Sequence, residues 1–265
     1  MEVPLSPGVF SMPELYVDNA VILAPLSGYT DLPFRRSCRR QGCHYAFTPL
    51  IDVGSLVFRN PRAPKLLERG AEEPWLGVQI LGADPQRVKE AACILNDRNF
   101  QILDFNLGCP VRKVVRRGAG AAMGETPAKA ANCLEAIAHV SRFPVTAKIR
   151  VLHEEDPRPT LEYVRLLVEA GARAVTIHGR IRQRMYSGPV ATRVIRAVAE
   201  SVDVPVIANG GVRDAATAAQ LRENSGCDRI MVARGAIGNP WIFRVLRGGE
   251  EADRREILAE LRRYL

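Results

Sequence analysis

The sequence predicts an α/β protein with the architecture of a (β/α)8 barrel. Short runs rich in Val, Ile and Leu alternate with helical segments along the chain of 265 residues, which is typical of parallel strands buried on both faces. Eight such units occupy about 245 residues, the number and length of a (β/α)8 barrel. A doubly wound sheet is the alternative, but no predicted strand is followed by the Gly-x-Gly-x-x-Gly turn of a dinucleotide-binding fold.

The predicted strands are short, apolar and bounded by turn residues. They cover residues 20–26, 45–51, 75–81, 100–106, 145–151, 174–178, 204–208 and 229–233. The helical segments that follow them cover residues 32–40, 61–69, 85–96, 127–140, 160–170, 191–201, 215–224 and 238–246. Asp84, Thr126 and Asp214 are suited to begin helices, and Gly171 and Gly226 are suited to end them.

The composition is that of a soluble globular protein. Hydrophobic residues make up 47% of the chain and charged residues 25%, which allows a sizeable core. No apolar run approaches the roughly 18 residues that span a bilayer, and the N-terminus lacks the features of an export signal. The six cysteines form no Cys-x-x-Cys pair and no His/Asp/Glu set has metal-ligand spacing, so we expect no metal site and a reducing cytoplasm.

The chain is basic, with 37 Lys and Arg against 29 Asp and Glu and a net charge of +8. This balance favours an acidic partner, of which nucleic acid is the most obvious. The basic residues cluster at 36–40, 111–117, 179–184 and near the C-terminus. The second and third clusters directly follow predicted strands, whereas the first and last fit solvated helix faces.

The segment 104–123, DFNLGCPVRKVVRRGAGAAM, is the most informative stretch of the chain. A buried strand ends near Asn106, and Gly108 and Pro110 place Cys109 on a turn directly after it. Two glycines, at positions 118 and 120, close a loop whose four basic residues are Arg112, Lys113, Arg116 and Arg117. Such a thiol could deliver a proton or a nucleophile to an anionic polymer, but a buried structural cysteine explains the stretch about equally well.

In a (β/α)8 barrel the functional groups gather at the carboxyl ends of the strands. Polar or glycine residues occupy nearly all of these positions: residues 25–28, Gln79, Asn106 with Cys109, Lys148 with Arg150, His178 with Arg180, residues 209–211 and residues 233–235. The glycines and Arg234 of the last two strands suit a phosphate monoester, and His178 could donate to a phosphate or a carbonyl. Lys148 could neutralise the N1/O2 side of a reduced flavin, form a Schiff base, or pair with an acid.

Taken together, these residues make the chain resemble the dihydrouridine synthases, flavoenzymes that reduce uridine in tRNA. The matching stretches are LAPLSGYTDLPFR (23–35), VQILGADP (78–85), DFNLGCPVRKVVRRGAGAAM (104–123), VTAKIR (145–150), TIHGR (176–180), PVIANGG (205–211) and MVARGAIGNPWIF (231–243). They span nearly the whole predicted barrel in order. The Asn-x-Gly-Cys-Pro element with its following glycine pair is the most specific of them.

The resemblance implies an FMN site on the barrel rim, with NADPH or NADH as the reductant. The residues implied in cofactor binding are Pro25, Leu26, Ser27, Gln79, Lys148, His178, Asn209, Gly210, Gly211, Ala233 and Arg234. Cys109 would be the catalytic acid that protonates C5 of a flipped-out uridine whose C6 receives hydride. Asn106, Arg150 and Tyr186 would bind the uracil ring or its phosphate.

The resemblance also implies tRNA as the partner, bound by the basic loops after predicted strands four and six. We expect residues 1–246 to form the FMN-binding catalytic barrel and residues 247–265 to begin a C-terminal helical RNA-binding domain that is cut short. The enzyme is expected to be cytoplasmic, monomeric, free of metal and independent of membranes. Two alternatives stay open, namely an FMN oxidoreductase of a free pyrimidine in the manner of dihydroorotate dehydrogenases, and a non-catalytic RNA-binding barrel.

Overall fold

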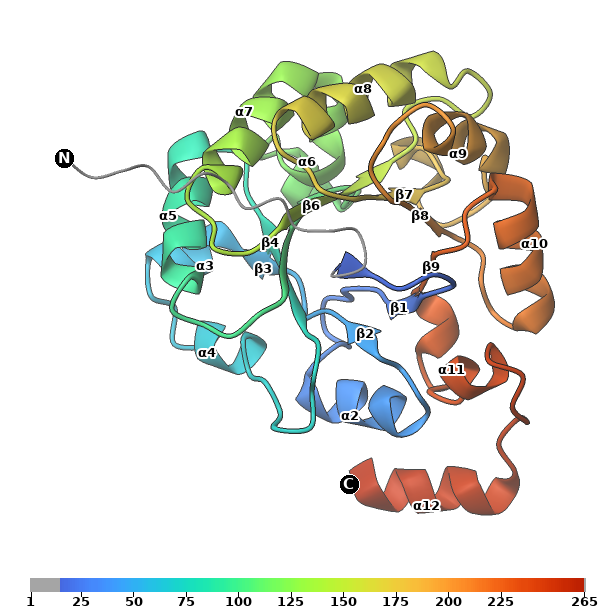
Figure 1. Ribbon diagram of the computed structural model, residues 1–265. Coiled ribbons are helices and arrows are strands. Elements are labelled where there is room, and N and C mark those ends of the chain that lie inside the picture. Colours follow the sequence, from blue (N-terminus) through green and yellow to red (C-terminus); the bar gives the residue numbers. More distant parts are fainter. Residues whose placement is uncertain (1–14, 265) are drawn as a thin grey trace.

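The computed structural model describes residues 15–264, in which parallel strands curl into a barrel with helices around it (Figure 1). The strands are β1 (Val21–Leu23), β2 (Tyr45–Ala46), β3 (Ile51–Asp52), β4 (Gly77–Leu81), β5 (Ile102–Leu107), β6 (Val145–Arg150), β7 (Val175–His178), β8 (Val206–Asn209) and β9 (Ile230–Val232). Hydrogen-bonded neighbours follow the order β2-β1-β9-β8-β7-β6-β5-β4-β3, and each of these pairs is parallel. The predicted α/β barrel is confirmed.

The barrel closes where the segment between β2 and β3 meets the first residue of β4. Phe47 forms a parallel bridge with Gly77, and the Thr48 N–H donates to the Gly77 carbonyl at 2.9 Å. A Cβ atom at Gly77 would lie 2.4 Å from the Phe47 ring, so glycine is required where the two segments meet. Pro49 has no N–H and cannot continue the ladder. The single strand predicted over 45–51 is therefore two short strands that occupy one place in the barrel.

Most of the helices surround the ring of strands (Figure 1). They are α2 (Leu32–Arg40), α3 (Val53–Val57), α4 (Ala63–Leu66), α5 (Pro85–Leu95), α6 (Arg112–Val115), α7 (Pro127–Ala138), α8 (Arg158–Glu169), α9 (Thr192–Ala199), α10 (Ala215–Ser225), α11 (Ile242–Val245) and α12 (Arg254–Tyr264). α4 and α11 are shorter than the predicted segments 61–69 and 238–246. α3 and α6 were not predicted, because four or five residues are too few to show a helical period.

The helix signals in the sequence are confirmed. Asp84 and Asp214 accept hydrogen bonds from the first-turn N–H groups of α5 and α10, at 2.9 and 2.7 Å. Gly226 ends α10 with a positive φ of 66°, as a C-cap glycine should. Thr126 precedes α7, but its side chain makes no capping hydrogen bond. There, Pro127 at the first helical position is the sequence signal that the structure uses.

An aromatic cluster fills the N-terminal end of the barrel. Its members are Tyr16, Tyr45, Phe47 and Trp75, and neighbouring ring centres lie 5.1–5.6 Å apart. These rings pack with Ile22, Ile102, Ile207 and other apolar side chains that the strands direct into the barrel interior. A larger apolar layer lies between the outer faces of the strands and the helices. Because side chains fill the N-terminal end, polar groups in the barrel interior are concentrated toward its carboxyl end.

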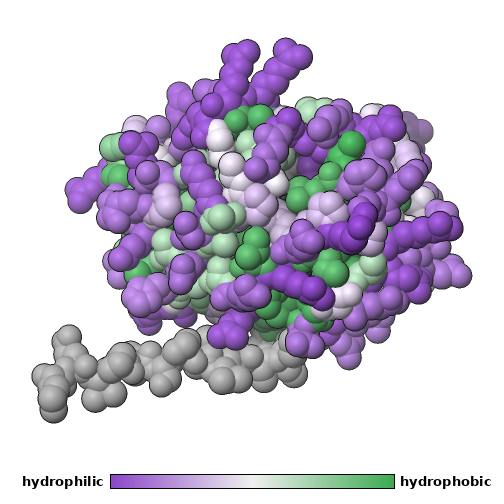
Figure 2. Space-filling view, turned by 90° about the horizontal axis from the view of Figure 1, so that it is seen from above, coloured by the Kyte–Doolittle hydropathy of each residue, from purple (hydrophilic) through white to green (hydrophobic). Residues whose placement is uncertain are grey.

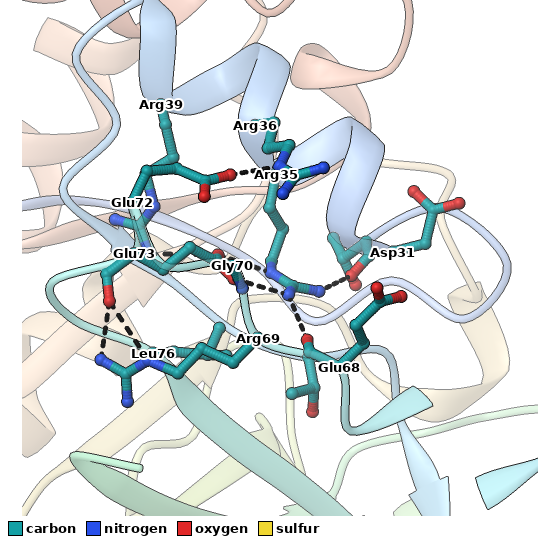
Figure 3. Close-up of polar contacts among 12 residues, drawn as sticks. Asp31, Arg35, Arg36, Arg39, Glu68, Arg69, Gly70, Glu72, Glu73 and Leu76 are labelled. Carbon is teal, nitrogen blue, oxygen red and sulfur yellow. Dashed lines mark hydrogen bonds and ion pairs between the residues drawn. The ribbon is translucent and has the colours of Figure 1, made fainter. Parts of the chain in front are cut away.

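A buried ionic cluster joins α2 to the segment that precedes β4 (Figure 3). Arg35 and Glu73 form an ion pair at 2.8 Å, with side chains that are 1% and 0% exposed. Arg35 also donates to the carbonyls of Thr30 and Glu68 at 2.8 and 2.7 Å. The Thr30 hydroxyl exchanges hydrogen bonds with the backbone of Leu26. The cluster therefore stabilises the loop that follows β1.

The last helix, α12, lies outside the ring of strands and contacts α2 (Figure 1). Arg40 on α2 donates from Nε to Glu260 on α12 at 3.2 Å, and the Glu260 side chain is mostly buried. A helix is thus present within the predicted segment 247–265, while its assignment to an RNA-binding domain stays a prediction.

The molecular face shown in Figure 2 is mostly hydrophilic, with small hydrophobic patches between the polar side chains. None of the helices in residues 15–264 has the length and apolar character needed to span a membrane.

Candidate active site

A cavity of about 850 Å³ lies at the carboxyl ends of the strands, within the size range of small-molecule sites. Its walls come from the ends of β1 and β5–β9 and from the loops that follow them. Of the predicted site residues, those that line it are Pro25, Leu26, Ser27, Asn106, Cys109, Lys148, Arg150, His178, Tyr186, Asn209, Gly210, Gly211, Ala233 and Arg234. The structure thus brings together nearly all of the residues that the sequence placed on one rim.

The cavity is strongly cationic. Its charged lining residues are Lys148, Arg150, Arg180, Arg213 and Arg234, and no carboxylate lines it within residues 15–264. His178 lies among these cations and is almost fully buried. The pKa of His178 is lowered to about 2, mainly because the ring is buried and secondarily because the charge of Lys148 is nearby. The ring is therefore neutral at physiological pH. A site with unmatched positive charge and a neutral donor suits an anionic ligand.

Lys148 on β6 is held in place by Asn209, which lies at the end of β8. Its Nζ donates to Asn209 Oδ1 at 2.9 Å, and Asn209 Nδ2 donates to the Met231 carbonyl at 2.7 Å. Burial and the charge of Arg150 lower the pKa of Lys148 to about 8, so the ammonium keeps its charge at neutral pH. Lys148 makes no ion pair with a carboxylate in the described part of the chain, which argues against a simple structural ion pair.

The loop that carries Cys109 is fixed by Asn106 and Gly120. Asn106 Oδ1 accepts hydrogen bonds from the N–H groups of Gly108 and Cys109 at 3.2 and 2.9 Å. Gly120 has a φ of +59°, and a Cβ atom there would lie 2.6 Å from the Cys109 carbonyl oxygen. The loop can therefore fold back over Cys109 only because glycine is at this position. Cys109 itself is half-buried in the cavity wall.

Arg150 connects two loops that border the cavity. Its Nε donates to the Gly108 carbonyl at 2.8 Å, and its Nη1 donates to the Met185 carbonyl at 2.7 Å. The guanidinium groups of Arg150 and Arg234 lie 5.5 and 4.8 Å from the centre of the Tyr186 ring. Tyr186 is 46% exposed, so this ring lies at the mouth of the cavity in contact with two cations.

Gln79 is the predicted site residue that does not line the cavity. It is fully buried, its Nε2 donates to Asp104 Oδ2 at 2.6 Å, and its Oε1 accepts from Asn106 Nδ2 at 2.8 Å. Its contact with a flavin stays a prediction. Asp104 was not singled out from the sequence, although a carboxylate within an otherwise apolar buried strand is a signal that could have identified it.

The two basic loops at the rim differ in whether their cations form ion pairs or hydrogen bonds with other parts of the protein. In the loop after β5, Arg112, Lys113 and Arg116 are exposed and form no ion pair within residues 15–264. Arg117 of this loop pairs with Asp52 at 2.6 Å.

In the loop after β7 the cations already have protein partners. Arg180 donates to the Gly188 carbonyl at 2.9 Å. Arg182 pairs with Glu125 at 2.7 Å, and Arg184 pairs with Glu154 at 2.9 Å. The two loops carry similar charge in the sequence, but only the first presents it free at the surface.

Comparison with known proteins agrees with this geometry. The model of the family described as Dihydrouridine synthase (Dus) matches residues 22–261. The tRNA-dihydrouridine synthase B of Pasteurella multocida is 36% identical over 89% of this chain and 71% of its own length. The tRNA-dihydrouridine synthase B of Pseudomonas aeruginosa is 38% identical over 88% and 71%. A probable tRNA-dihydrouridine synthase of Rhodobacter capsulatus is 38% identical over 87% and 72%.

Among solved structures, a FabK mutant from Thermotoga maritima superposes with a TM-score of 0.50 at 15% identity, covering 86% of this chain and 65% of that one. This likeness concerns the fold alone. The family match extends over most of the chain, and the relatives are similar to it along most of their own length. The chain therefore belongs to the dihydrouridine synthase family.

Proposed function

We propose that this protein is an FMN-dependent tRNA-dihydrouridine synthase, which reduces the C5–C6 double bond of uridine in tRNA with NADPH or NADH as reductant. Membership of the family makes it an oxidoreductase that acts on CH–CH bonds. The names of its relatives support tRNA as the substrate. The observation that carries the proposal is that the Cys109 thiol shares one cavity with a set of cations that no carboxylate balances.

The residues of the cavity fit FMN. Arg234, the neutral ring of His178 and the backbone at 210–211 would hold the phosphate. Gly210 has a φ of +131° and a Cβ atom there would lie 3.1 Å from the His178 ring, so glycine allows the backbone to pass close to the imidazole. The backbone of residues 25–27 and the Lys148 ammonium would meet the ring system. When bound and reduced, the flavin would supply hydride to C6 of the uracil.

Cys109 would act as a general acid. Its S–H bond breaks as the proton passes to C5, so the base gains one hydrogen at each carbon, and the thiolate takes up a proton from solvent afterwards. Asn106 holds the loop that carries this thiol, and Arg150 and Tyr186 would bind the base or its phosphate. The uridine must leave its stack to reach a thiol in the cavity wall.

The free cations of the loop after β5 would bind backbone phosphates of the tRNA, which would make binding sensitive to salt. A free pyrimidine would not need this surface. We also propose that α12 begins a helical RNA-binding domain. Ile257, Leu258 and Leu261 on this helix are 40–55% exposed, which supports further packing against it.

The decisive experiment measures dihydrouridine formed in unmodified tRNA by the purified protein with FMN and NADPH at low salt. We expect product, which would establish the reaction. A yellow protein that NADPH bleaches without forming product would contradict the tRNA substrate and leave a flavin oxidoreductase with another acceptor. A colourless protein that forms no product would favour the non-catalytic RNA-binding barrel.

A further inference from the structure

Three polar side chains lie next to one another in the barrel interior, beneath the cavity. The strand register pairs Gln79 of β4 with Asp104 of β5, and Asp104 with Thr146 of β6. All three are at most 3% exposed. Asn106, two residues after Asp104, faces the same side of β5 because side chains alternate along a strand. Asn106 is therefore one layer nearer to the cavity, which it lines.

The ionised form of a carboxylate only accepts hydrogen bonds, and this determines the direction of every bond above Asp104. Asp104 accepts from Thr146 Oγ1 and from Gln79 Nε2, both at 2.6 Å. The Gln79 nitrogen is thereby turned toward Asp104, and its oxygen accepts from Asn106 Nδ2 at 2.8 Å. The Asn106 oxygen is then left to accept from the Gly108 and Cys109 N–H groups.

We infer that Asp104 is a positioning residue that orients the loop carrying the Cys109 thiol, acting through the amides of Gln79 and Asn106. A reversed Gln79 amide would force Asn106 to reverse as well. The Asn106 NH2 group would then face two N–H donors in a partly buried place, where unmatched donors are unfavourable. The inference rests on the proposed function in one respect, namely that Cys109 is the group whose position matters.

The environment of Asp104 supports this role. Burial raises its pKa to about 6, while the hydrogen bonds and the charge of Lys148 on β6 oppose that rise. Tyr16 of the aromatic cluster also interacts electrostatically with this carboxylate, which contributes to the raised pKa of Tyr16. Asp104 makes no ion pair within residues 15–264, and a buried carboxylate without one is unfavourable for folding. A buried carboxylate that lowers stability in this way calls for a role beyond packing.

The test is the rate at which iodoacetamide alkylates Cys109 in the full chain, followed by mass spectrometry of its peptide at about pH 8, where Asp104 is ionised. Asp104→Leu removes the acceptor, so the loop is released, and we expect alkylation about tenfold faster and kcat for uridine reduction about tenfold lower. KM for tRNA should change little. Asp104→Asn still offers Gln79 an acceptor, and both rates should stay within about threefold of the parent.

Thr146→Val is the matched control. It removes the other hydrogen bond to the same carboxylate but leaves the path through Gln79 intact, so Cys109 alkylation should change less than about twofold. Four buried cysteines report global unfolding within the same sample: Cys38, Cys43, Cys133 and Cys227. If they react together with Cys109 in Asp104→Leu, that variant is unfolded and Gln79→Met decides instead, with the same expected increase.

Unchanged Cys109 alkylation in a folded Asp104→Leu or Gln79→Met protein would overturn the inference. An increase in Cys109 alkylation in Thr146→Val as large as in Asp104→Leu would also overturn it. Such a result would show only a general loosening of the layer formed by Gln79, Asp104 and Thr146. Alkylation needs neither tRNA nor hydride. A parent protein that forms no dihydrouridine would therefore contradict the proposed function without affecting this result.

Discussion

Arginine side chains are buried at two places in this barrel, and the two places satisfy them differently. In the cluster of Figure 3, Glu73 pairs with Arg35, and Arg69 donates to the Glu73 carbonyl at 2.6 Å. In the cavity, Arg150 and Arg180 donate to backbone carbonyls, but no carboxylate lines the walls within the described residues. The cluster is therefore balanced by the protein itself, whereas the cavity keeps positive charge for a ligand.

The difference shows that the role of a charged segment depends less on how much charge it carries than on whether that charge has a protein partner. The loops after β5 and β7 repeat the contrast at the surface. Arg182 and Arg184 are paired with acids from other loops, whereas Lys113 and Arg116 are exposed and have no such partner within residues 15–264. Matched cations should thus affect stability, and unmatched ones should affect binding and catalysis.

The largest expected effect belongs to the cavity. Cys109→Ala should lower uridine reduction by roughly 10²–10⁴-fold, because general acid catalysis contributes about that much, while flavin content and stability stay unchanged. The measurement is dihydrouridine formed per tRNA over time. Cys93→Ala is the matched control, since Cys93 is exposed on α5 and does not line the cavity. Full turnover in Cys109→Ala would exclude Cys109 as the proton donor.

The next effect belongs to the buried cluster. Glu73→Gln removes one partner of a fully buried ion pair and should lower the free energy of unfolding by about 3–5 kcal/mol. Urea unfolding measures this loss. Glu72→Gln is the control, because the Arg36–Glu72 pair is almost half exposed and should contribute far less to stability. Equal losses in the two variants would break the contrast between matched and exposed charge.

Lys148→Met separates binding from stability. It should weaken FMN binding by roughly tenfold to a hundredfold, since a charged hydrogen bond contributes about 1.5–3 kcal/mol. The folded protein lowers the pKa of Lys148 to about 8, so the charged form is disfavoured by folding and its removal should not lower stability at neutral pH.

The same pKa predicts how binding by the parent protein depends on pH. Affinity for FMN should fall as the pH rises through about 8, where Lys148 loses its proton, and Lys148→Met should lack this step. Fluorescence titration of FMN across this range is the measurement. An equal pH step in both proteins would assign it to another group.

The smallest effect concerns the loops. Replacing Lys113 and Arg116 by alanine should reduce the salt dependence of tRNA binding by up to about two units of slope, because each phosphate contact contributes roughly 0.9. The double variant of Arg182 and Arg184 removes the same charge from ion-paired positions and should change the slope less. Equal slopes would show that net charge alone governs binding.

Much of the fold and of the candidate site could be predicted from the sequence, because both depend largely on local sequence pattern. Apolar runs and helix signals locate the strands and helices, and the rule that barrel sites form at strand ends brings Cys109, Lys148 and His178 to one cavity. These inferences need no knowledge of which atoms meet.

What could not be predicted depends on register and on distant partners. The place of Gln79 beneath Asn106 follows from the pairing of β4 with β5. Arg184 finds Glu154 thirty residues away in the chain, and Arg150 connects Gly108 with Met185. Sequence shows that these charges exist but not which atoms they meet.

The closure of the barrel at Phe47 and Gly77 has a consequence for its motions. β2 and β3 contribute two residues each on either side of a single bridge, so few hydrogen bonds hold the ring there. β5 and β6, in contrast, pair over five positions. Local opening should begin at this narrow seam, and the Thr48 amide should exchange with solvent before those of β5 and β6. Thermal breathing would then be confined to this side of the ring, with β4 lying between the seam and β5.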